Sequence, residues 1–463
     1  MRLGKLNRIH FVGIGGIGMS GIAEVLLTQG FTVTGSDARE SAVLSRLRAR
    51  GAHLTVGHGA QNLGNAQVLV YSSAVDPRNP ELVEARRLGI PVIPRAEMLA
   101  ELMRLKSSVA VAGSHGKTTV TAMVAHLAHK AGLDPTVVIG GRLSTLDASA
   151  RLGSGDLLVA EADESDRSFL LLYPSLAVIT NIDWEHVDCY SDLEDLKGAF
   201  LQFANRVPFY GACVLCADDP NIRDLLPRFS RRVVTYGLSQ DALVRATRVP
   251  PEGPGETFLV AVAGENRGKV QVPQAGRHIV LDALAALAVG EEMGVPFEVM
   301  REHLATFPGA DRRFQVRGEV GGILVVDDYG HHPTEISATF DTARRVAGDG
   351  RLVVLFQPHR FTRMAALMDG FARVLSLADL VLVSDIYAAS EAPISGVTGA
   401  ALAGKIEAFG EAQAHFCARV EDMPSAVRPM LRSGDLVLTL GAGNITNAGP
   451  ELLELLKREG HGP

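Results

Sequence analysis

The chain has 463 residues, 47% of them hydrophobic and 21% charged, with a formal net charge of -7. That length is too great for one hydrophobic core and indicates about three domains. The acidic balance argues against nucleic acid or an anionic membrane as the main partner. Because no apolar run reaches the ~18 residues of a membrane span and no signal peptide is evident, we expect a cytoplasmic protein without membrane insertion.

Residues 8–37 have the pattern of a strand, a glycine-rich turn, a helix and a second strand that ends at Asp37. The turn matches the spacing Gly-x-Gly-x-x-Gly with Gly13, Gly15 and Gly18. In this setting the pattern is the dinucleotide-binding fingerprint, which alone favours an NAD enzyme. The physical requirement, however, is only a diphosphate at a helix N-terminus, and a nucleotide sugar satisfies it equally.

Further strands and helices alternate after this turn. A strand is predicted over residues 68–72 and helices over 80–88 and 98–106, and we expect the first domain to end with the last of these. Ser72 and Ser73 close the strand, at the position where ligand loops lie in an open α/β sheet. For these serines, a ligand contact and a simple turn are equally consistent with the pattern.

The most informative stretch is residues 108–120, where an apolar strand breaks at Gly113 and a helical pattern follows Gly116-Lys117-Thr118. Exposed backbone N–H groups and the helix dipole make such a turn an anion site. Lys117 would offer a cation to the outer phosphates, and Thr118 would offer a hydroxyl to a magnesium ion. The spacing between the glycines is shorter than in the full Walker A pattern. We interpret the stretch as an ATP-binding loop, formed by Gly113, Ser114, His115, Gly116, Lys117, Thr118 and Thr119.

Acidic side chains follow the next two predicted strands, over residues 156–161 and 176–180. The ends of parallel strands converge at one edge of the sheet, which places these acids beside the phosphate loop. Two like charges about 4 Å apart repel by roughly 4 kcal/mol at an effective dielectric near 20, so a triphosphate there needs more than Lys117 to neutralise it. We therefore expect magnesium, with Glu161 as a ligand. Most of the acids that follow are expected to be solvated loop charges: they are Asp163, Glu164 and Asp166.

The rest of the central region contains a cysteine pair, a hairpin-like segment and two helices. Cys213 and Cys216 lie in an apolar strand without a second cysteine pair, which favours buried core over a zinc site. Residues 241–272 are predicted to be short strands joined by turns, and helical patterns cover 276–292 and 298–306.

The C-terminal region again alternates strands and helices, and dense polar sequences follow its strands. His331 and His332 could bind a metal ion together, but adjacent residues of a strand point apart and Pro333 follows, so we favour no metal there. Arg360 and Arg363 lie just past a strand end, and a guanidinium group matches a carboxylate in shape. We therefore favour substrate binding over surface charge for both arginines. The whole chain is predicted to be α/β.

These motifs together resemble the Mur ligase family over essentially the whole chain. They are Gly-Ile-Gly-Gly-Ile-Gly-Met-Ser-Gly (13–21), Gly-Ser-His-Gly-Lys-Thr-Thr (113–119), Glu-Ala-Asp-Glu-Ser-Asp (161–166), Asn-Ile-Asp-Trp-Glu-His-Val-Asp (181–188), Arg-Arg-Phe (312–314), Asp-Asp-Tyr-Gly-His-His-Pro-Thr-Glu (327–335), Gln-Pro-His-Arg-Phe-Thr-Arg (357–363) and Gly-Ala-Gly-Asn-Ile (441–445). Each motif alone is moderate evidence, and their common order makes the resemblance highly specific.

The resemblance implies three domains: a Rossmann-like UDP-sugar-binding domain over 1–106, a central P-loop ATP-binding domain with a mixed sheet over 107–315, and a Rossmann-like domain on the amino-acid side over 316–463. It implies that the lactyl carboxylate of UDP-N-acetylmuramate receives the γ-phosphoryl group of ATP, and that L-alanine attacks the acyl phosphate. A carboxylate is a poor acyl donor until its oxygen becomes a phosphate leaving group, so the ATP loop agrees with this reaction. The product would be a peptidoglycan precursor, and we expect a monomer or weak homodimer.

The resemblance also implies roles for individual residues. Thr118 and Glu161 would bind a first magnesium ion, and His186 would bind a second one between the substrate carboxylate and the γ-phosphate. Arg313, or else Arg312, would lie near the nucleotide. Catalytic roles would fall to Lys117, Glu161, His186, Arg313, Asp328 and His331. The amino-acid side would comprise His331, His359, Arg360 and Arg363. The UDP-sugar would contact Gly13, Gly15, Gly16, Ile17, Gly18, Asp37, Ser72 and Ser73.

Two features depart from the family pattern. Family members usually have asparagine near the adenine where this chain has Ile279 and Asp282, so the adenine contacts are expected to differ. Several related ligases carry a carbamylated lysine, but this chain has Phe200 or Leu201 at that spacing, and we predict none. The alanine-adding branch of the family generally lacks that lysine, which agrees with its absence here.

Three other functions remain open at this point. A recycling ligase that attaches a tripeptide to the same sugar shares most motifs, but it typically lacks the doubled glycine seen here as Gly15-Gly16. An NAD-dependent dehydrogenase would explain the first fingerprint and would leave the ATP loop without a purpose. A non-catalytic nucleotide-binding regulator is suggested only by the two residues that replace asparagine.

Overall fold

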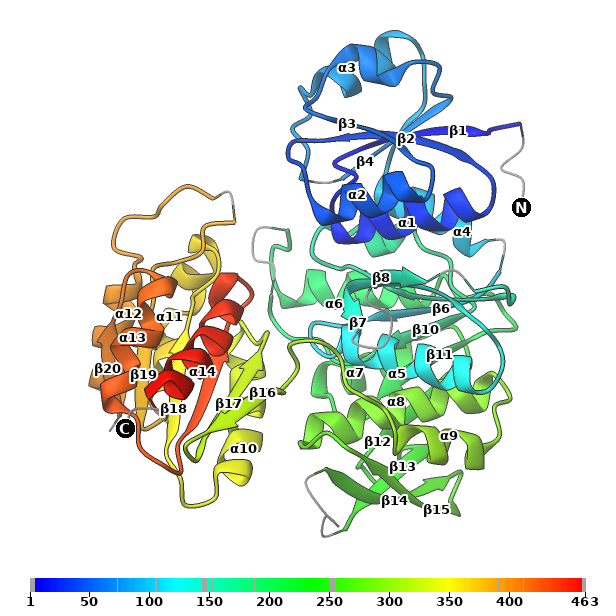
Figure 1. The fold of residues 1–463 in the computed structure, drawn as a ribbon. Helices are drawn as coiled ribbons and strands as arrows, with labels where there is room; N and C mark the ends of the chain where they lie inside the picture. Colours follow the sequence, from blue (N-terminus) through cyan, green and yellow to red (C-terminus); the bar gives the residue numbers. More distant parts are fainter. Residues whose placement is uncertain are drawn as a thin grey trace.

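The computed structural model describes residues 5–72, 74–104, 106–143, 148–151, 153–185, 189–249, 255–389, 391–410 and 412–459. They form three α/β units in chain order, each built on its own β-sheet (Figure 1). The predicted fold class, α/β with a mixed central sheet between two Rossmann-like units, is therefore confirmed. None of the helices in these ranges is long and apolar enough to cross a membrane.

The N-terminal unit is a parallel sheet of five strands in the order β3-β2-β1-β4-β5. Its elements are β1 (Arg8–Val12), α1 (Ile17–Thr28), β2 (Thr32–Asp37), α2 (Ala42–Ala49), β3 (His53–Val56), β4 (Val68–Tyr71), α3 (Pro80–Arg87), β5 (Val92–Pro94) and α4 (Arg95–Met103). The strand order reverses between β1 and β4, and a ligand crevice forms at the carboxyl ends of open α/β sheets at such a point. The glycine-rich turn after β1 lies there.

The central unit is a sheet of ten strands in the order β15-β14-β13-β12-β11-β10-β6-β9-β7-β8. Its elements are β6 (Ser107–Ala112), α5 (Lys117–Lys130), β7 (Thr136–Leu143), β8 (Ala148–Arg151), β9 (Leu157–Glu161), β10 (Leu176–Ile179), α6 (Leu193–Ala204), β11 (Ala212–Cys216), α7 (Pro220–Leu225), β12 (Val233–Gly237), β13 (Val244–Arg248), β14 (Glu256–Val262), β15 (Glu265–Val272), α8 (Arg277–Glu292) and α9 (Phe297–Leu304). Strand β6 lies between β9 and β10 and is parallel to both, so the loop after β6 is flanked by their carboxyl ends.

Two predictions for the central unit are confirmed. Cys213 and Cys216 are buried in β11, where burial raises the pKa of each thiol to about 12. The hairpin-like segment is an antiparallel extension of the sheet formed by β13, β14 and β15.

The C-terminal unit is a six-stranded sheet in the order β16-β17-β21-β18-β19-β20, parallel except for the edge strand β16. Its elements are β16 (Gln315–Val320), β17 (Ile323–Asp328), α10 (Pro333–Ala347), β18 (Leu352–Phe356), α11 (Phe361–Leu375), β19 (Leu380–Val383), α12 (Gly399–Phe409), β20 (Gln413–Phe416), α13 (Met423–Val427), β21 (Leu436–Leu440) and α14 (Ala448–Glu459). Short 3-10 helices lie at Ala60–Leu63, Ser168–Leu171, Leu226–Arg228, Val420–Asp422, Arg428–Met430 and Asn444–Asn447.

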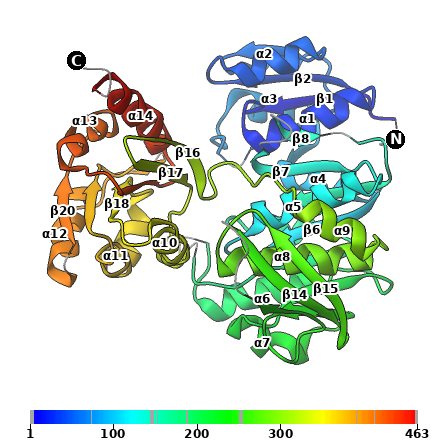
Figure 2. The same cartoon turned by 60° about the horizontal axis from the view of Figure 1, so that its bottom comes forward.

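The hydrophobic cores show how the three units are joined. One apolar cluster runs from the N-terminal sheet, through α1, into the central sheet, and α1 lies against β7 and β8 (Figure 1). The C-terminal unit has two clusters of its own on the two faces of its sheet. Helix α10 lies on the side that faces the central unit, as Figure 2 shows from a second direction. The contact between these two units is therefore made by polar side chains rather than by a shared core.

Candidate active site

Two glycines give the loop between β6 and α5 its shape. Gly113 has a φ of +138° and Gly116 a φ of +81°, a region that L side chains rarely adopt. A Cβ atom would lie 1.9 Å from Thr180 Oγ1 at the first glycine and 2.8 Å from Asp282 Oδ1 at the second. Because α5 begins at the next residue, the loop presents the positive end of a helix dipole at the carboxyl edge of the sheet.

The end of β10 holds this loop in place. Asn181 accepts hydrogen bonds from the backbone N–H groups of Ser114, at 3.1 Å, and His115, at 2.8 Å. The Thr180 hydroxyl donates to the carbonyl oxygen of His115 at 2.5 Å. The loop conformation is thus set by the neighbouring strand before any ligand binds.

Lys117 lies folded over its own loop. Its Nζ donates to the carbonyl oxygens of Gly113 and Ser114 and, at 2.8 Å, to the carboxylate of Glu164. Burial lowers the pKa of Lys117, but Glu164 and Glu161 more than offset this, so the pKa is raised and the cation is retained. Glu164 is an exception to the expectation that most of these acids are solvated loop charges. It is 1% exposed, because the Lys117 ammonium group compensates its charge inside the protein.

Thr118 and Glu161 form an oxygen pair beside the loop. The Thr118 hydroxyl, in the first turn of α5, donates to Glu161 Oε2 at 3.1 Å, and Glu161 is the last residue of β9. A hydroxyl and a carboxylate are the donors that Mg²⁺ prefers, so this pair fits a magnesium ion. His186, predicted as the ligand of a second ion, lies outside the described residues.

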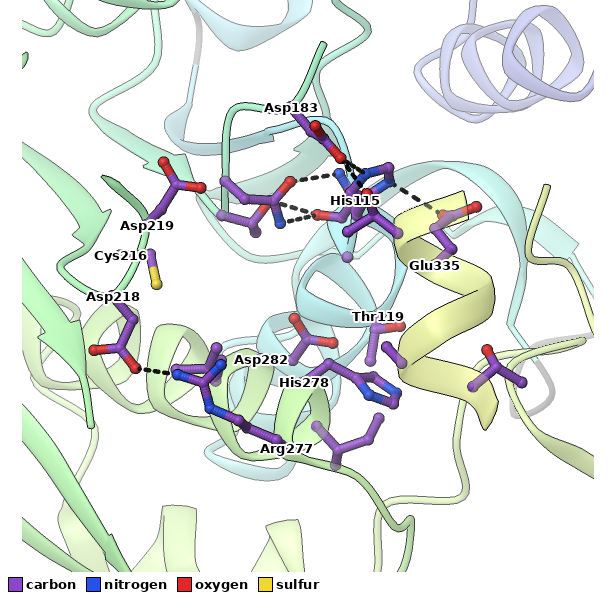
Figure 3. A pocket seen from close by; sticks show the side chains of 18 of the residues that line it. His115, Thr119, Asp183, Cys216, Asp218, Asp219, Arg277, His278, Asp282 and Glu335 are labelled. Carbon is purple, nitrogen blue, oxygen red and sulfur yellow. Dashed lines mark hydrogen bonds and ion pairs between the residues drawn. The ribbon is translucent and has the colours of Figure 1, made fainter. Parts of the chain in front are cut away.

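A cavity of about 440 Å³ opens from the loop toward α8 and α10 (Figure 3). At one end it is lined by the loop itself, including His115, Gly116 and Thr119. Other lining residues come from the strand ends and helix α8, among them Cys216, Tyr236, Arg277, His278, Ile279 and Asp282. Arg313, Asp328 and Glu335 lie on the side of the C-terminal unit. The cavity has the size of a small-molecule site and is shared by two units.

The two residues that replace the expected asparagines, Ile279 and Asp282, both line this cavity. Figure 3 shows Asp282 and its neighbour His278 on the cavity side of α8. Burial raises the pKa of Asp282 to about 8, although Arg313 acts in the opposite direction. Burial and Arg313 both lower the pKa of His278, to about 4. At neutral pH both side chains are therefore mainly uncharged.

Arg312 and Arg313 belong to the segment that joins the central and C-terminal units, and they point to different places. Arg312 is in the left-handed region, with a φ of +58°, and binds Asp327 at 3.1 Å and the carbonyl oxygen of Gly441 at 2.5 Å. Arg313 lines the cavity and contacts Glu335 at 3.4 Å. Arg312 therefore ties the segment to the C-terminal sheet, and Arg313 is the one of the two that reaches the cavity.

Asp328 is the last residue of β17 and also lines the cavity. Its carboxylate oxygens accept hydrogen bonds from two backbone N–H groups and one hydroxyl group. One oxygen accepts the N–H of Phe314 at 2.8 Å, and the other accepts the N–H of Gly330 at 2.8 Å and the hydroxyl of Thr339 at 3.3 Å. Burial raises its pKa despite these bonds and the nearby Arg313. The carboxyl group thus fixes the conformation of the segment that carries Arg313.

Polar contacts between the central and C-terminal units centre on Asp183 and His115. Asp183 Oδ2 lies 3.0 Å from His115 Nε2 and accepts the hydroxyl of Thr334, the second residue of α10, at 2.6 Å. His115 Nδ1 lies 3.5 Å from Glu335 Oε1. Burial lowers the pKa of His115, but Asp183 and Glu335 outweigh it and raise the pKa to about 10. A positively charged imidazole therefore joins the ATP-type loop to α10.

The residues predicted for the amino-acid side do come together in the C-terminal unit. The rings of His331 and His359 are 5.9 Å apart in an edge-to-face arrangement. Burial lowers the pKa of His331 to about 3 and that of His359 to about 4, so both are neutral at pH 7. Arg360 is the N-cap residue of α11. Arg363 lies in the first turn of this helix, with a buried Nη1 that has no hydrogen-bond partner among the described residues. This group offers a cation and two neutral imidazoles.

A second hollow, of about 730 Å³, lies in the N-terminal unit at the end of β1. It is lined by four of the residues predicted for the UDP-sugar: Gly13, Gly16, Asp37 and Ser72. Asp37 accepts the backbone N–H of Gly15 at 2.8 Å, which holds the glycine-rich turn against β2. At Gly18, a Cβ atom would lie 2.1 Å from Arg95 Nη1, so a larger residue there would require the Arg95 side chain to move. Ser73 lies outside the described residues.

Sequence reasoning missed Arg95, Asp183 and Glu335 as site residues. Arg95 contacts Asp163 at 3.4 Å and so links the glycine-rich turn to the acids that follow β9. Glu335 is an acid in the first turn of a helix, where it accepts the N–H of His331 at 3.0 Å. That position is explained equally well by helix capping, so no local signal in the sequence distinguishes its second role.

A phosphate-type loop, a hydroxyl–carboxylate pair and a cavity between two α/β units define the chain as a multidomain nucleotide-binding protein. Three family models match it in order: "Mur ligase family, catalytic domain" over residues 8–107, "Mur ligase middle domain" over 111–290, and "Mur ligase, glutamate ligase domain" over 312–443. The chain belongs to the Mur ligase family.

Individual relatives cover nearly the whole chain. A UDP-N-acetylmuramate--L-alanine ligase from Myxococcus xanthus is 56% identical over 97% of this chain and 95% of its own length. The crystal structure of a UDP-N-acetylmuramate-alanine ligase from Thermotoga maritima aligns with a TM-score of 0.81 and 29% identity, covering 98% of this chain and 99% of the other. A murein peptide ligase from Psychrobacter arcticus aligns with a TM-score of 0.70 and 25% identity, covering 97% and 98%.

Proposed function

We propose that the chain catalyses the ATP-dependent joining of L-alanine to the lactyl carboxylate of UDP-N-acetylmuramate, a step in the synthesis of peptidoglycan precursors. ADP and phosphate are released, and an acyl phosphate is the intermediate. The observation that carries the proposal is the cavity between the ATP-type loop and the C-terminal unit, in a chain 56% identical to a curated UDP-N-acetylmuramate--L-alanine ligase. A reaction of three substrates needs such a place where domains meet, because catalysis depends on positioning the reacting groups together.

The loop after β6 is proposed to bind ATP through Gly113, Ser114, His115, Gly116, Lys117, Thr118 and Thr119. When ATP binds, the ammonium group of Lys117 leaves Glu164 and contacts the outer phosphates. The buried ammonium group thus has an anionic partner both before and after ATP binds. Arg313 neutralises charge that develops on the transferred group, and Asp328 holds the backbone that presents this arginine. In phosphoryl transfer, positioning and neutralisation of charge supply most of the catalysis.

Thr118 and Glu161 are the residues that would hold a magnesium ion, as their adjacent oxygen atoms suggest. Magnesium at this place supplies positive charge to the phosphate groups during transfer. We propose two such ions, with His186 as a ligand of the second.

The amino-acid side is proposed to be formed by His331, His359, Arg360 and Arg363. The buried Nη1 of Arg363 suits a carboxylate, because an unpaired guanidinium group inside a protein gains from a forked, charge-assisted contact. The neutral imidazoles of His331 and His359 can accept N–H bonds from the amino group of L-alanine. The amine is thereby held beside the cavity in which the acyl phosphate forms.

The N-terminal hollow is proposed to bind the UDP-sugar through Gly13, Gly15, Gly16, Ile17, Gly18, Asp37, Ser72 and Ser73. We propose domain limits of 1–106, 107–315 and 316–463. The first limit lies directly before β6 of the central sheet, and the second lies one residue inside β16, the first strand of the C-terminal sheet. We further propose a cytoplasmic monomer or weak homodimer that has no nucleic-acid partner.

Phosphate release with ATP, magnesium and UDP-N-acetylmuramate tests the proposal, with L-alanine, glycine, L-serine and a tripeptide as acceptors. We expect turnover with L-alanine at the highest kcat/KM. A second candidate, tripeptide attachment, is favoured by the likeness to the murein peptide ligase, and turnover with the tripeptide alone would establish it in place of the first. Absence of turnover with every acceptor would contradict both and favour a regulator.

A further inference from the structure

A network of buried polar side chains lies beside the N-terminal hollow, and none of the roles proposed above involves it. His10 in β1, Ser36 in β2 and Glu81 in α3 are each 0% exposed. His58, in the loop after β3, extends this network to the hollow, which it helps to line. The network therefore connects the interior of the N-terminal unit to the place where the UDP-sugar is proposed to bind.

Glu81 is the central acceptor of this network. Its carboxylate oxygens accept hydrogen bonds from four groups: His10 Nε2 at 2.9 Å, the Ser36 hydroxyl at 2.7 Å, the Gly59 N–H at 3.0 Å and Asn62 Nδ2 at 2.8 Å. Burial raises the pKa of Glu81, but these hydrogen bonds outweigh burial and lower the pKa to about 2. The carboxylate is therefore ionised at neutral pH and has no proton to donate.

The ionised carboxylate fixes the position of the proton on His58. Ser36 has one hydroxyl hydrogen, and Glu81 takes it, because a carboxylate can only accept. The same hydroxyl oxygen lies 2.9 Å from His58 Nδ1, so it accepts a hydrogen bond from that nitrogen. A neutral imidazole has one proton, which is thus on Nδ1, and Nε2 is left as a hydrogen-bond acceptor. Because Nδ1 faces the buried Ser36, Nε2 is the nitrogen available to a ligand in the hollow.

The strand order indicates which part of the nucleotide meets His58. The strands lie side by side in the order β3-β2-β1, and the glycine-rich turn follows β1, Asp37 ends β2 and His58 follows β3. In folds of this kind the turn suits a diphosphate, and an acid at the end of the second strand suits the ribose hydroxyls. Gly57 donates its N–H to the carbonyl oxygen of Asp37 at 2.8 Å, which holds His58 next to the ribose position. The base, which follows the ribose, then lies nearest to His58.

We propose that His58 selects uracil, because its Nε2 accepts a hydrogen bond from the N3–H group of the base. The inference rests on the proposed binding of the UDP-sugar in this hollow, and it names the residue that recognises the base. Cytosine has a nitrogen lone pair in place of this N–H, so a cytidine nucleotide would bring two acceptors together with no proton between them. Ser36 and Glu81 are positioning residues, because they hold His58 in the tautomer that accepts.

Nuclear magnetic resonance of the full chain with ¹⁵N-labelled histidine tests the tautomer without any ligand. The signal of His58 is identified by its absence from His58→Ala. We expect the Nδ1–H form of His58 at pH 8. Ser36→Ala removes the acceptor of this proton and should move His58 toward the Nε2–H form. A wild-type His58 in the Nε2–H form would overturn the proposal, and an unchanged tautomer in Ser36→Ala would overturn the role of Ser36.

Calorimetric titration of the full chain with UDP, CDP and dUDP at pH 8 tests the selection itself. We expect the wild type to bind UDP at least ~10-fold more tightly than CDP, and His58→Ala to reduce this ratio to below ~3-fold. His53→Ala is the matched control and should keep the wild-type ratio, because His53 is exposed in β3 and does not line the hollow. UDP and dUDP differ only in the 2′-hydroxyl group, so the ratio of their affinities should be the same in the wild type and in His58→Ala.

A preference for UDP over CDP that His58→Ala leaves unchanged would overturn the selection of uracil, with UDP binding in the hollow still intact. A loss of affinity for UDP that dUDP does not share would place the contact on the ribose and would overturn it as well. If the wild type bound none of these nucleotides, the proposed role of the hollow would fail together with the inference. Melting temperatures show whether each variant folds as the wild type does. If His58→Ala does not fold, Ser36→Ala decides, because its preference for UDP should also fall.

Discussion

Asp282 offers the sharpest test of the electrostatics of the cavity. Its side chain lies beside Gly116 at the base of the ATP-type loop and is 7% exposed. Among the described residues, none donates a hydrogen bond to its carboxyl group, and Arg313 is the one charge that favours ionisation. The perturbation we choose is Asp282→Asn, which keeps the shape of the side chain and cannot ionise.

The sign of the effect follows from the raised pKa. Asp282 contributes fully to stability below its unfolded pKa of 3.8, and this contribution is lost as the pH rises toward the folded value of about 8. The loss amounts to ~1.4 kcal/mol per pH unit in that window, or about 4 kcal/mol at pH 7. We therefore expect Asp282→Asn to be more stable than the wild type at pH 7, by up to ~4 kcal/mol. The amide group introduced by the substitution needs hydrogen-bond partners of its own. Lack of such partners lowers the stability of the variant by the same amount at every pH.

Scanning calorimetry of both proteins from pH 5 to pH 9 measures the difference. In a domain of roughly 150–250 residues, such as the central unit, a stability difference of 1 kcal/mol corresponds to roughly 2–4 °C in melting temperature. The gap between variant and wild type should widen steadily up to about pH 8 and then stay level. The exposed Asp241→Asn, in the same unit, is the control and should show no such trend. A gap that is independent of pH would refute the reasoning, because the acid would then be ionised throughout.

Three further substitutions test the proposed roles. Lys117→Ala should reduce turnover by at least ~10²-fold and leave UDP-sugar binding, measured by calorimetry, nearly intact, because the two sites lie in different units; loss of sugar binding would contradict that separation. Arg363→Ala should raise the KM for L-alanine ~30-fold or more, as expected when a buried charge contact of about 2 kcal/mol is lost, and an unchanged KM would move the carboxylate to Arg360 or elsewhere. Gly113→Ala should lower the melting temperature by the equivalent of at least ~1–3 kcal/mol, from its left-handed φ and its clash with Thr180. Adding Thr180→Ala should restore part of that loss, and no restoration would show that the clash is not its cause.

Local patterns in the sequence predicted the framework of the site. The glycine-rich turn after β1 and the loop from Gly113 to Thr119 follow from a strand that breaks at glycine and a helix that starts directly afterwards. Both signals are local, because glycine adopts a left-handed φ and allows a close approach of the backbone far more readily than other residues. The alternation of strands and helices likewise predicted three α/β units, and Glu161 at the end of β9, beside the loop.

Only the tertiary structure decided which charges meet in the interior. Glu164 is indistinguishable in sequence from its solvated neighbours, and it is buried because the strand order places β9 next to β6 and so brings Lys117 to it. Asp183 contacts His115 and His332, and Glu335 contacts His115, because α10 of the C-terminal unit lies against the loop of the central unit. Such contacts join residues far apart in the chain, and burial makes each of them strong by removing water. The sequence therefore determined the elements and the phosphate-type loop, and the packing of three sheets determined the ionisation states and the partners around it.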